Sequence, residues 1–194
     1  MAGTLYITGD KASDALLNTD ANALLLGMLL DQQVSMERAF AGPSTLKQRL
    51  GHLDPRKIAA MDVGQFMSIC YQKPAIHRFP GSMGKRIHAV CEALVGDYQG
   101  NAANIWKGVD AAAEVYRRLR ELPGYGDEKS KIFIAILAKT QNVELVGWRD
   151  TAGKFGDDTP RSVADVRNEV SLGKVREWKK AQKAARKDKQ DRPI

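Results

Sequence analysis

Two glycines lie one residue apart in the stretch Leu122-Pro123-Gly124-Tyr125-Gly126, between two segments with helical patterns. Glycine lets a backbone turn sharply because it adopts positive φ without strain. A turn of this kind, followed at once by a helix, points bare amide groups and the positive end of that helix toward one phosphate group. The stretch therefore predicts either a phosphate-binding turn or an ordinary interhelical turn with a glycine cap.

Two glutamines, Gln32 and Gln33, follow the most apolar run of the chain, and Ser35 comes shortly after them. A glutamine side chain both donates and accepts hydrogen bonds, so it can replace the bonds of a base pair in an opened duplex. The alternative is a polar helix end beside a serine that caps the next helix. Both interpretations stay open on the residues alone.

The elements that must position these groups are helices almost throughout. The apolar run after Asp20 lacks a polar face, which indicates a buried central helix. The main helices are expected over 20–33, 36–41, 43–50, 83–98, 109–122 and 127–139. The two segments around the glycine turn form a helix–turn–helix hairpin over about 109–139. The sequence predicts an all-α protein.

Several of these segments follow one another in the order typical of one family. The chain resembles the HhH-GPD superfamily, the endonuclease III-type base-excision DNA glycosylases, over roughly 20–150. In that family the hairpin reads L-P-G-x-G, and the second helix of many members ends in L-S-Q-Q-(T/V)-S, as Leu29–Ser35 nearly does. A loop then leads into a helix that opens with K-A or K-R, as at Phe79–Ile87. Without cysteines for an iron–sulfur cluster, the chain is most similar to a short bacterial branch.

The resemblance implies a two-lobed helical fold around a DNA groove. The helical barrel would span 20–139, and residues 1–19 with 140–178 would form the second lobe, followed by a basic tail over 179–194. Residues expected on the DNA are Gln32, Gln33, Ser35, Met83, Lys85, Gly124, Tyr125, Gly126, Lys129 and Ser130. An apolar wedge into the base stack would be Met83 or the neighbouring Phe79.

The resemblance also implies a catalytic carboxylate beyond the hairpin. Asp150, followed by Thr151, matches the family's Asp-Thr pair, although Arg149 precedes it and no histidine follows. The expected role of Asp150 is to stabilise the positive sugar and to orient water. Asp157 and Asp158 on the same irregular segment are rivals.

The position of the family's nucleophilic lysine, two residues after the second glycine of the hairpin, is occupied by Glu128. We therefore expect no β-lyase step. The expected function is a monofunctional DNA glycosylase that removes a flipped damaged or mismatched base. The alternatives are a non-catalytic DNA-binding protein with the same fold and a protein-interaction module.

The net charge of +7 in 194 residues is concentrated at the C-terminus. Residues 174–194 carry nine basic and three acidic side chains, so the remainder is close to neutral. This basic tail could add salt-sensitive affinity for phosphates or keep the protein in solution. We expect double-stranded DNA as the partner, a monomer, and no membrane association.

Only two cysteines occur, Cys70 and Cys91, which is too few for a four-cysteine iron–sulfur cluster. They are expected to be reduced core thiols. No cofactor is expected, although the resemblance allows a monovalent cation at the hairpin carbonyls. Because no export segment is recognisable, we expect a cytoplasmic, nucleoid-associated protein.

Overall fold

The computed structural model describes residues 3–193, which form ten α-helices and three short 3-10 helices, with no strand among them. The predicted all-α fold is confirmed. The α-helices are α1 (Lys11–Thr19), α2 (Ala21–Leu30), α3 (Met36–Leu50), α4 (Pro55–Ala59), α5 (Val63–Tyr71), α6 (Pro80–Tyr98), α7 (Ala112–Glu121), α8 (Asp127–Thr140), α9 (Trp148–Ala152) and α10 (Glu169–Ala184). Within the described part of the chain, no helix is both long and apolar enough to cross a membrane.

The central helix is α2, as its composition predicts. The carboxylate of Asp20 accepts hydrogen bonds from the backbone amides of Asn22 and Ala23, which caps the helix. Apart from Asn22, every residue of α2 is buried. A Cβ at Gly27 would lie 2.8 Å from the ring of Phe40, so glycine allows α2 and α3 to approach closely. The helix therefore lies in the middle of the core.

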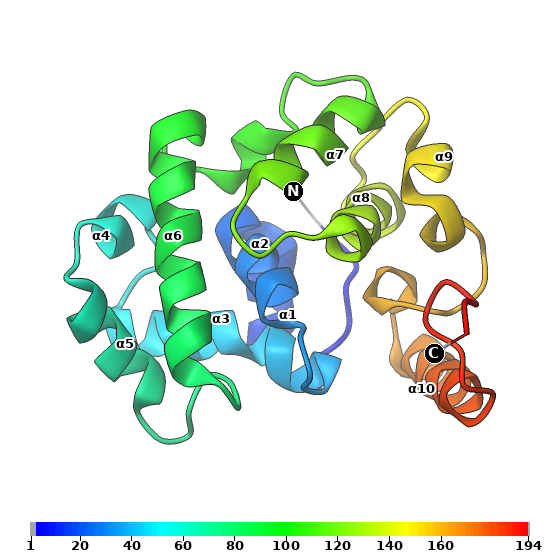
Figure 1. Ribbon diagram of the computed structural model, residues 1–194, viewed down its shortest axis with the longest axis horizontal. Helices are drawn as coiled ribbons and strands as arrows, with labels where there is room; N and C mark the ends of the chain where they lie inside the picture. The colour runs from blue at the N-terminus through cyan, green and yellow to red at the C-terminus, as the bar shows by residue number, and fades with distance from the viewer. Residues whose placement is uncertain (1–2, 194) are drawn as a thin grey trace.

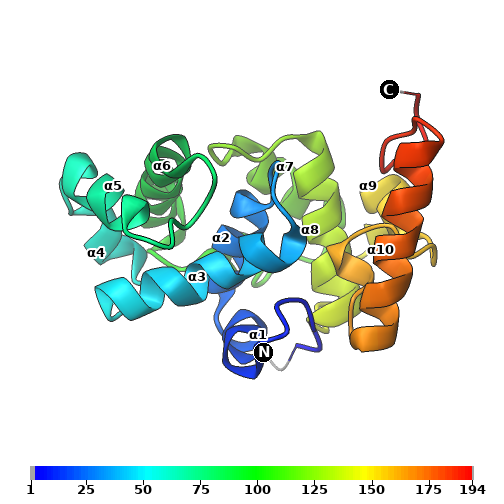
Figure 2. The same cartoon turned by 90° about the horizontal axis from the view of Figure 1, so that it is seen from below.

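Helices α4, α5 and α6 form one side of the molecule, and α9 and α10 form the opposite side, with α2 and α8 between them (Figure 1). The same order is visible from below (Figure 2). The N-terminal segment joins the later part of the chain, because the amide of Thr4 donates to the carbonyl of Thr140 at 2.8 Å and that of Tyr6 to Val166 at 3.3 Å. Two ends of the sequence thus share one region of the structure.

Helix α3 is continuous, whereas the sequence pattern suggested two short helices that meet at Pro43. A proline inside a helix removes one backbone hydrogen bond. Here Gly42 and Pro43 are both buried, and a Cβ at Gly42 would lie only 2.4 Å from Leu30. Tight packing against α2 therefore outweighs the missing hydrogen bond.

The basic tail folds back onto the protein and does not extend into solvent as a helix. Helix α10 continues to Ala184, past the expected start of the tail at residue 179. The chain then turns back, with a bridge between Lys187 and Pro193. The guanidinium of Arg161, itself buried, lies 2.8 Å from the carboxylate of Asp191. These contacts hold the last described residues against the folded protein.

Candidate nucleic-acid interface

The glycine turn has one position that requires glycine. Gly124 has a φ of +84°, and a Cβ there would lie 2.8 Å from Leu29 of α2. Gly126 has a φ of −82° and a ψ of 178°, which is open to any residue, and a Cβ there would meet nothing closer than 3.8 Å. Positive φ, expected to be available at both glycines, is therefore used only at Gly124.

Tyr125, between the glycines, faces the core. Its hydroxyl donates a hydrogen bond of 2.6 Å to the carbonyl of Leu25, and its ring meets Phe133 edge to face with centroids 6.1 Å apart. Only 3% of the residue is exposed. The expectation that Tyr125 contacts DNA is not supported by this placement, because its side chain anchors the turn to α2.

Lys129, expected to lie on the phosphate side of α8, instead reaches the C-terminal end of α2. Its ammonium group donates to the carbonyls of Met28 at 2.6 Å, Leu29 at 3.1 Å and Asp31 at 2.8 Å. These are among the carbonyls that a helix leaves without partners at its end. Burial lowers the pKa of Lys129 to about 8, while the carboxylate of Asp31 opposes that shift. Lys129 therefore fixes the hairpin to the glutamine segment.

The glutamine segment is a turn between α2 and α3, which we call the Gln turn (residues 31–35). Gln33 is exposed and has a φ of +52°, an uncommon conformation for a residue other than glycine. The carbonyl of Gln32 accepts from Nε2 of His77 at 2.9 Å, and its side-chain oxygen accepts from Arg86 at 2.8 Å. Ser35 accepts from the amide of Arg38 and so caps α3, the alternative to its expected DNA contact.

His77 connects the Gln turn to the loop before α6. The amide of Phe79 donates to Nδ1 of His77, so the ring proton is on Nε2, which donates to Gln32. Burial lowers the pKa of His77, which keeps the ring neutral and preserves this arrangement. The loop, the Gln turn and the hairpin are therefore held together by His77 and Lys129.

Of the two candidate wedge residues, only Phe79 is exposed. Met83 is 2% exposed and faces the core, whereas Phe79 is 44% exposed and lies against the guanidinium of Arg78. Lys85 is exposed on α6, but Ser130 is buried and its hydroxyl has no hydrogen-bond partner. The expected DNA contacts of Met83 and Ser130 are therefore not supported by their burial.

Glu128 lies at the start of α8, next to the folded-back tail. Its carboxylate is 3.3 Å from the ammonium of Lys189. No local pattern predicts this contact, because the two residues are far apart in the chain. The tail thus places a lysine beside the position at which the resemblance would put a nucleophilic lysine.

A pocket of about 520 Å³ opens between the Gln turn and α10. Its lining residues are Asp31, Gln33, Val34, Ser35, Met36, Glu37, Arg176, Lys179 and Lys189. Arg176 and Glu37 close one side with an ion pair of 2.7 Å. Burial acts to raise the pKa of Glu37. Hydrogen bonds to its carboxylate from its own backbone amide, Arg176 and Ser35 outweigh burial and lower the pKa. We call this cavity the inter-lobe pocket, after the two lobes that the resemblance implies.

Seven of the nine residues that line the inter-lobe pocket are not among the expected DNA contacts, and Asp31 and Lys179 are the two that bear on its chemistry. Asp31 precedes the glutamines and could have been selected from that motif. Lys179 could not, because only tertiary packing brings α10 to the Gln turn. Its ammonium lies 3.4 Å from the sulfur of Met36. Burial lowers the pKa of Lys179, and so does the charge of Lys189.

Asp150 is exposed on the short helix α9 and lines none of the pockets described here. The chain just before it, at Val146, bonds to Asp110 and Ala112, at the start of α7. That start is a whole helix away from the glycine turn, about 15 Å along α7. The structure therefore places the segment that carries Asp150 beside the start of α7, at the end of the hairpin unit away from its glycine turn.

The two rival carboxylates, Asp157 and Asp158, also lie outside the inter-lobe pocket. Asp157 is bound to Arg161 at 2.6 Å and to the amide of Thr159, which gives it a structural role. Burial acts to raise the pKa of Asp157, but the hydrogen bonds from Arg161 and Thr159 outweigh it, so the pKa is lowered. The side chain of Asp158 is 96% exposed. Neither lines the inter-lobe pocket.

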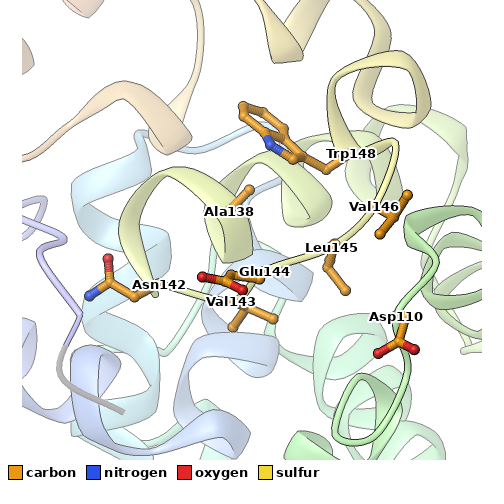
Figure 3. Close-up of a pocket in the computed structure, with 8 residues that line it drawn as sticks. All are labelled: Asp110, Ala138, Asn142, Val143, Glu144, Leu145, Val146 and Trp148. Carbon is orange, nitrogen blue, oxygen red and sulfur yellow. The ribbon is translucent and has the colours of Figure 1, made fainter.

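Another pocket lies beside the far end of the hairpin unit, where α8 ends (Figure 3). Asp110 and Glu144 contribute two carboxylates, and Trp148 lies over one side. No basic side chain is among the eight residues that line it. Its charge is therefore unsuited to the phosphates of DNA.

Within residues 3–193, no group of three or more His, Cys, Asp or Glu side chains is arranged to hold a metal ion. Cys70 and Cys91 are free and buried, as expected of core thiols. Burial raises the pKa of each to about 12, which keeps them protonated.

Comparison with known proteins gave one match. The family model described as HhH-GPD superfamily base excision DNA repair protein matches residues 26–190. This range includes the hairpin, the Gln turn and α10. Neither the curated proteins nor the solved structures gave a match.

Proposed function

Because the chain belongs to the HhH-GPD superfamily of base excision DNA repair proteins, we propose that it is a monofunctional DNA glycosylase. Proteins of this family bind DNA, and the proposed reaction is hydrolysis of the N-glycosidic bond of a flipped damaged or mismatched base. The observation that carries the proposal is the position of the inter-lobe pocket, which opens beside the Gln turn that Lys129 fixes to the hairpin.

The proposed DNA contacts follow from the exposed groups around this pocket. Gly124 and the start of α8 offer backbone amides to a phosphate group. Gln33, exposed on its turn, would fill the space left by a flipped nucleotide, with Phe79 as the wedge into the stack. Arg86 and Lys85 on α6 would add phosphate contacts.

The proposed carboxylate is Asp31, in place of Asp150. Asp31 lines the pocket, and its charge acts on both Lys129 and Lys179. A carboxylate at the edge of the pocket suits the stabilisation of a positive sugar. Asp150 remains the alternative, which side-chain substitution can decide. No step of the proposal uses a metal ion or a cofactor.

The absence of a β-lyase step is part of the proposal. Glu128 occupies the position of the family's nucleophilic lysine, and Lys189 beside it is paired with that carboxylate. This ion pair engages the lysine that lies nearest to the position of the nucleophile. The protein is also proposed to act as a monomer in the cytoplasm, on the nucleoid.

A non-catalytic DNA-binding protein is the second candidate. The observation that favours it is the exposed position of Asp150, the residue that best matches the family's carboxylate motif. Such a protein would retain the hairpin and bind DNA without releasing a base.

Base release separates the two candidates. The full chain is incubated with duplexes that contain uracil, an alkylated purine or an oxidised base, and the free base is measured directly. A glycosylase releases at least one base and leaves the DNA strand uncut. Borohydride reduction should trap no covalent complex, because no imine forms. Tight binding of all the duplexes without base release would favour the second candidate.

A further inference from the structure

The inter-lobe pocket contains one cation that is poorly matched by its surroundings. Arg176 is paired with Glu37, and Lys189 with Glu128. Lys179 is half-buried, and the hydrogen bond described for its ammonium goes to the thioether of Met36. Sulfur is a weak acceptor. The ammonium therefore has donor capacity to offer a ligand in the pocket.

The charges that face Lys179 come from three elements. Asp31 lies at the end of α2, Glu37 in the first turn of α3, and Glu128 in the first turn of α8. Lys189 adds a second positive charge from the tail. Since Glu37 and Glu128 already have cationic partners, Asp31 is the carboxylate left to balance Lys179.

The remaining lining is unsuited to a positively charged base. None of the described residues that line the pocket is aromatic. A cationic ligand is normally bound against aromatic faces or by uncompensated carboxylates. Here it would meet Lys179 and Lys189 without an aromatic surface to offset their repulsion.

We propose that the inter-lobe pocket selects a neutral base with a carbonyl group next to the glycosidic nitrogen, as in uracil and oxidised pyrimidines, through a hydrogen bond from the Lys179 ammonium. Cationic alkylated purines, such as 7-methylguanine, are excluded by the same charge. The role of Lys179 in the reaction rests on the proposed function, whereas its preference in binding does not require that a base is released.

The same hydrogen bond assists departure of the base. When the bond between C1′ and the base nitrogen breaks, both electrons go to the base, and negative charge develops on its carbonyl oxygen. The ammonium of Lys179, as the donor of that hydrogen bond, would stabilise this charge. The oxygen of water then bonds to C1′, and the proton that water loses ends on the released base. Burial lowers the pKa of Lys179, which strengthens it as a donor.

The test compares Lys179→Met with Lys180→Met, since Lys180 is an exposed neighbour on the same helix and lines no part of the pocket. Affinity is measured for duplexes with a 2′-fluorinated nucleotide, whose base cannot be released readily. One duplex carries uracil and another 7-methylguanine. We expect tighter binding of the uracil duplex, and a loss of that preference of about tenfold in Lys179→Met alone.

Two results would overturn the inference. One is equal or tighter binding of the 7-methylguanine duplex by the unaltered protein. The other is an unchanged preference in Lys179→Met. Base release from the unfluorinated duplexes is measured in parallel. If the unaltered protein prefers the uracil duplex but releases no base, the glycosylase reaction is rejected and the binding role of Lys179 stands. If the protein releases 7-methylguanine alone, the glycosylase reaction stands and the proposed selectivity of the pocket is rejected.

Discussion

The ammonium of Lys129, in the first turn of α8, lies 2.8 Å from the backbone carbonyl of Asp31, at the end of α2. The two residues are 98 positions apart in the chain. Their hydrogen bond joins the hairpin to the Gln turn, the two segments that are most similar to DNA-contacting parts of the family. Any movement of one segment must therefore strain or break the contact with the other.

Replacement of Lys129 by methionine should destabilise the protein. The methionine keeps an apolar stem but removes the ammonium donor from three carbonyls of α2 and its turn, and that of Asp31 has no other described donor. We expect a loss of about 1–3 kcal/mol in the free energy of unfolding. Urea denaturation measures it, with Lys131→Met as the matched control, because the ion pair of Lys131 with Asp127 lies at the surface. Equal losses in both variants would contradict the structural role of Lys129.

The same lysine should make stability depend on pH in the alkaline range. Burial lowers the pKa of Lys129 to about 8 in the folded state, below its ordinary value of about 10.4 when unfolded. Between these values the unfolded chain binds more protons, so the contribution of Lys129 to the free energy of unfolding rises with pH. It is least favourable below pH 8.

Urea denaturation at pH 7.5, 9 and 10 tests this dependence. The quantity to compare is the difference in free energy of unfolding between the unaltered protein and Lys129→Met. That difference should increase with pH, because other groups that titrate in this range are common to both proteins. A difference that stays constant from pH 7.5 to 10 would mean that the pKa of Lys129 is not lowered.

The two hairpin glycines should respond differently to alanine. Gly124→Ala puts a Cβ at positive φ and 2.8 Å from Leu29, so we expect a loss of about 1–2 kcal/mol in the free energy of unfolding and weaker DNA binding. Gly126→Ala meets neither obstacle and should leave stability nearly unchanged. Thermal unfolding and DNA titration of both variants check the contrast. Similar destabilisation by the two substitutions would show that the turn has another conformation.

How far the sequence predicts this site depends on the range of the interactions. The Asp20 cap, the apolar run of α2 and the glycine hairpin are local signals, and the structure contains all three elements. The burial of Tyr125 has no local signal, because its hydroxyl donates to the carbonyl of Leu25, 100 residues away in the chain. Lys179 was missed for the same reason. Local patterns cannot reveal contacts that form only when distant segments meet.

The last prediction concerns the carboxylate that supports base release. Asp31→Asn keeps the size of the side chain and the backbone carbonyl that Lys129 binds, but it removes the negative charge from the inter-lobe pocket. If that charge stabilises the positive sugar, single-turnover base release should fall by about 10²–10³-fold, the scale of losing one preorganised electrostatic group. DNA affinity should fall little. Asp150→Asn changes an exposed side chain on α9 and should leave the rate close to that of the unaltered protein. The opposite pattern, with the rate lost in Asp150→Asn and kept in Asp31→Asn, would return the catalytic role to Asp150 and would place the reaction at the α9 end of the hairpin rather than at the inter-lobe pocket.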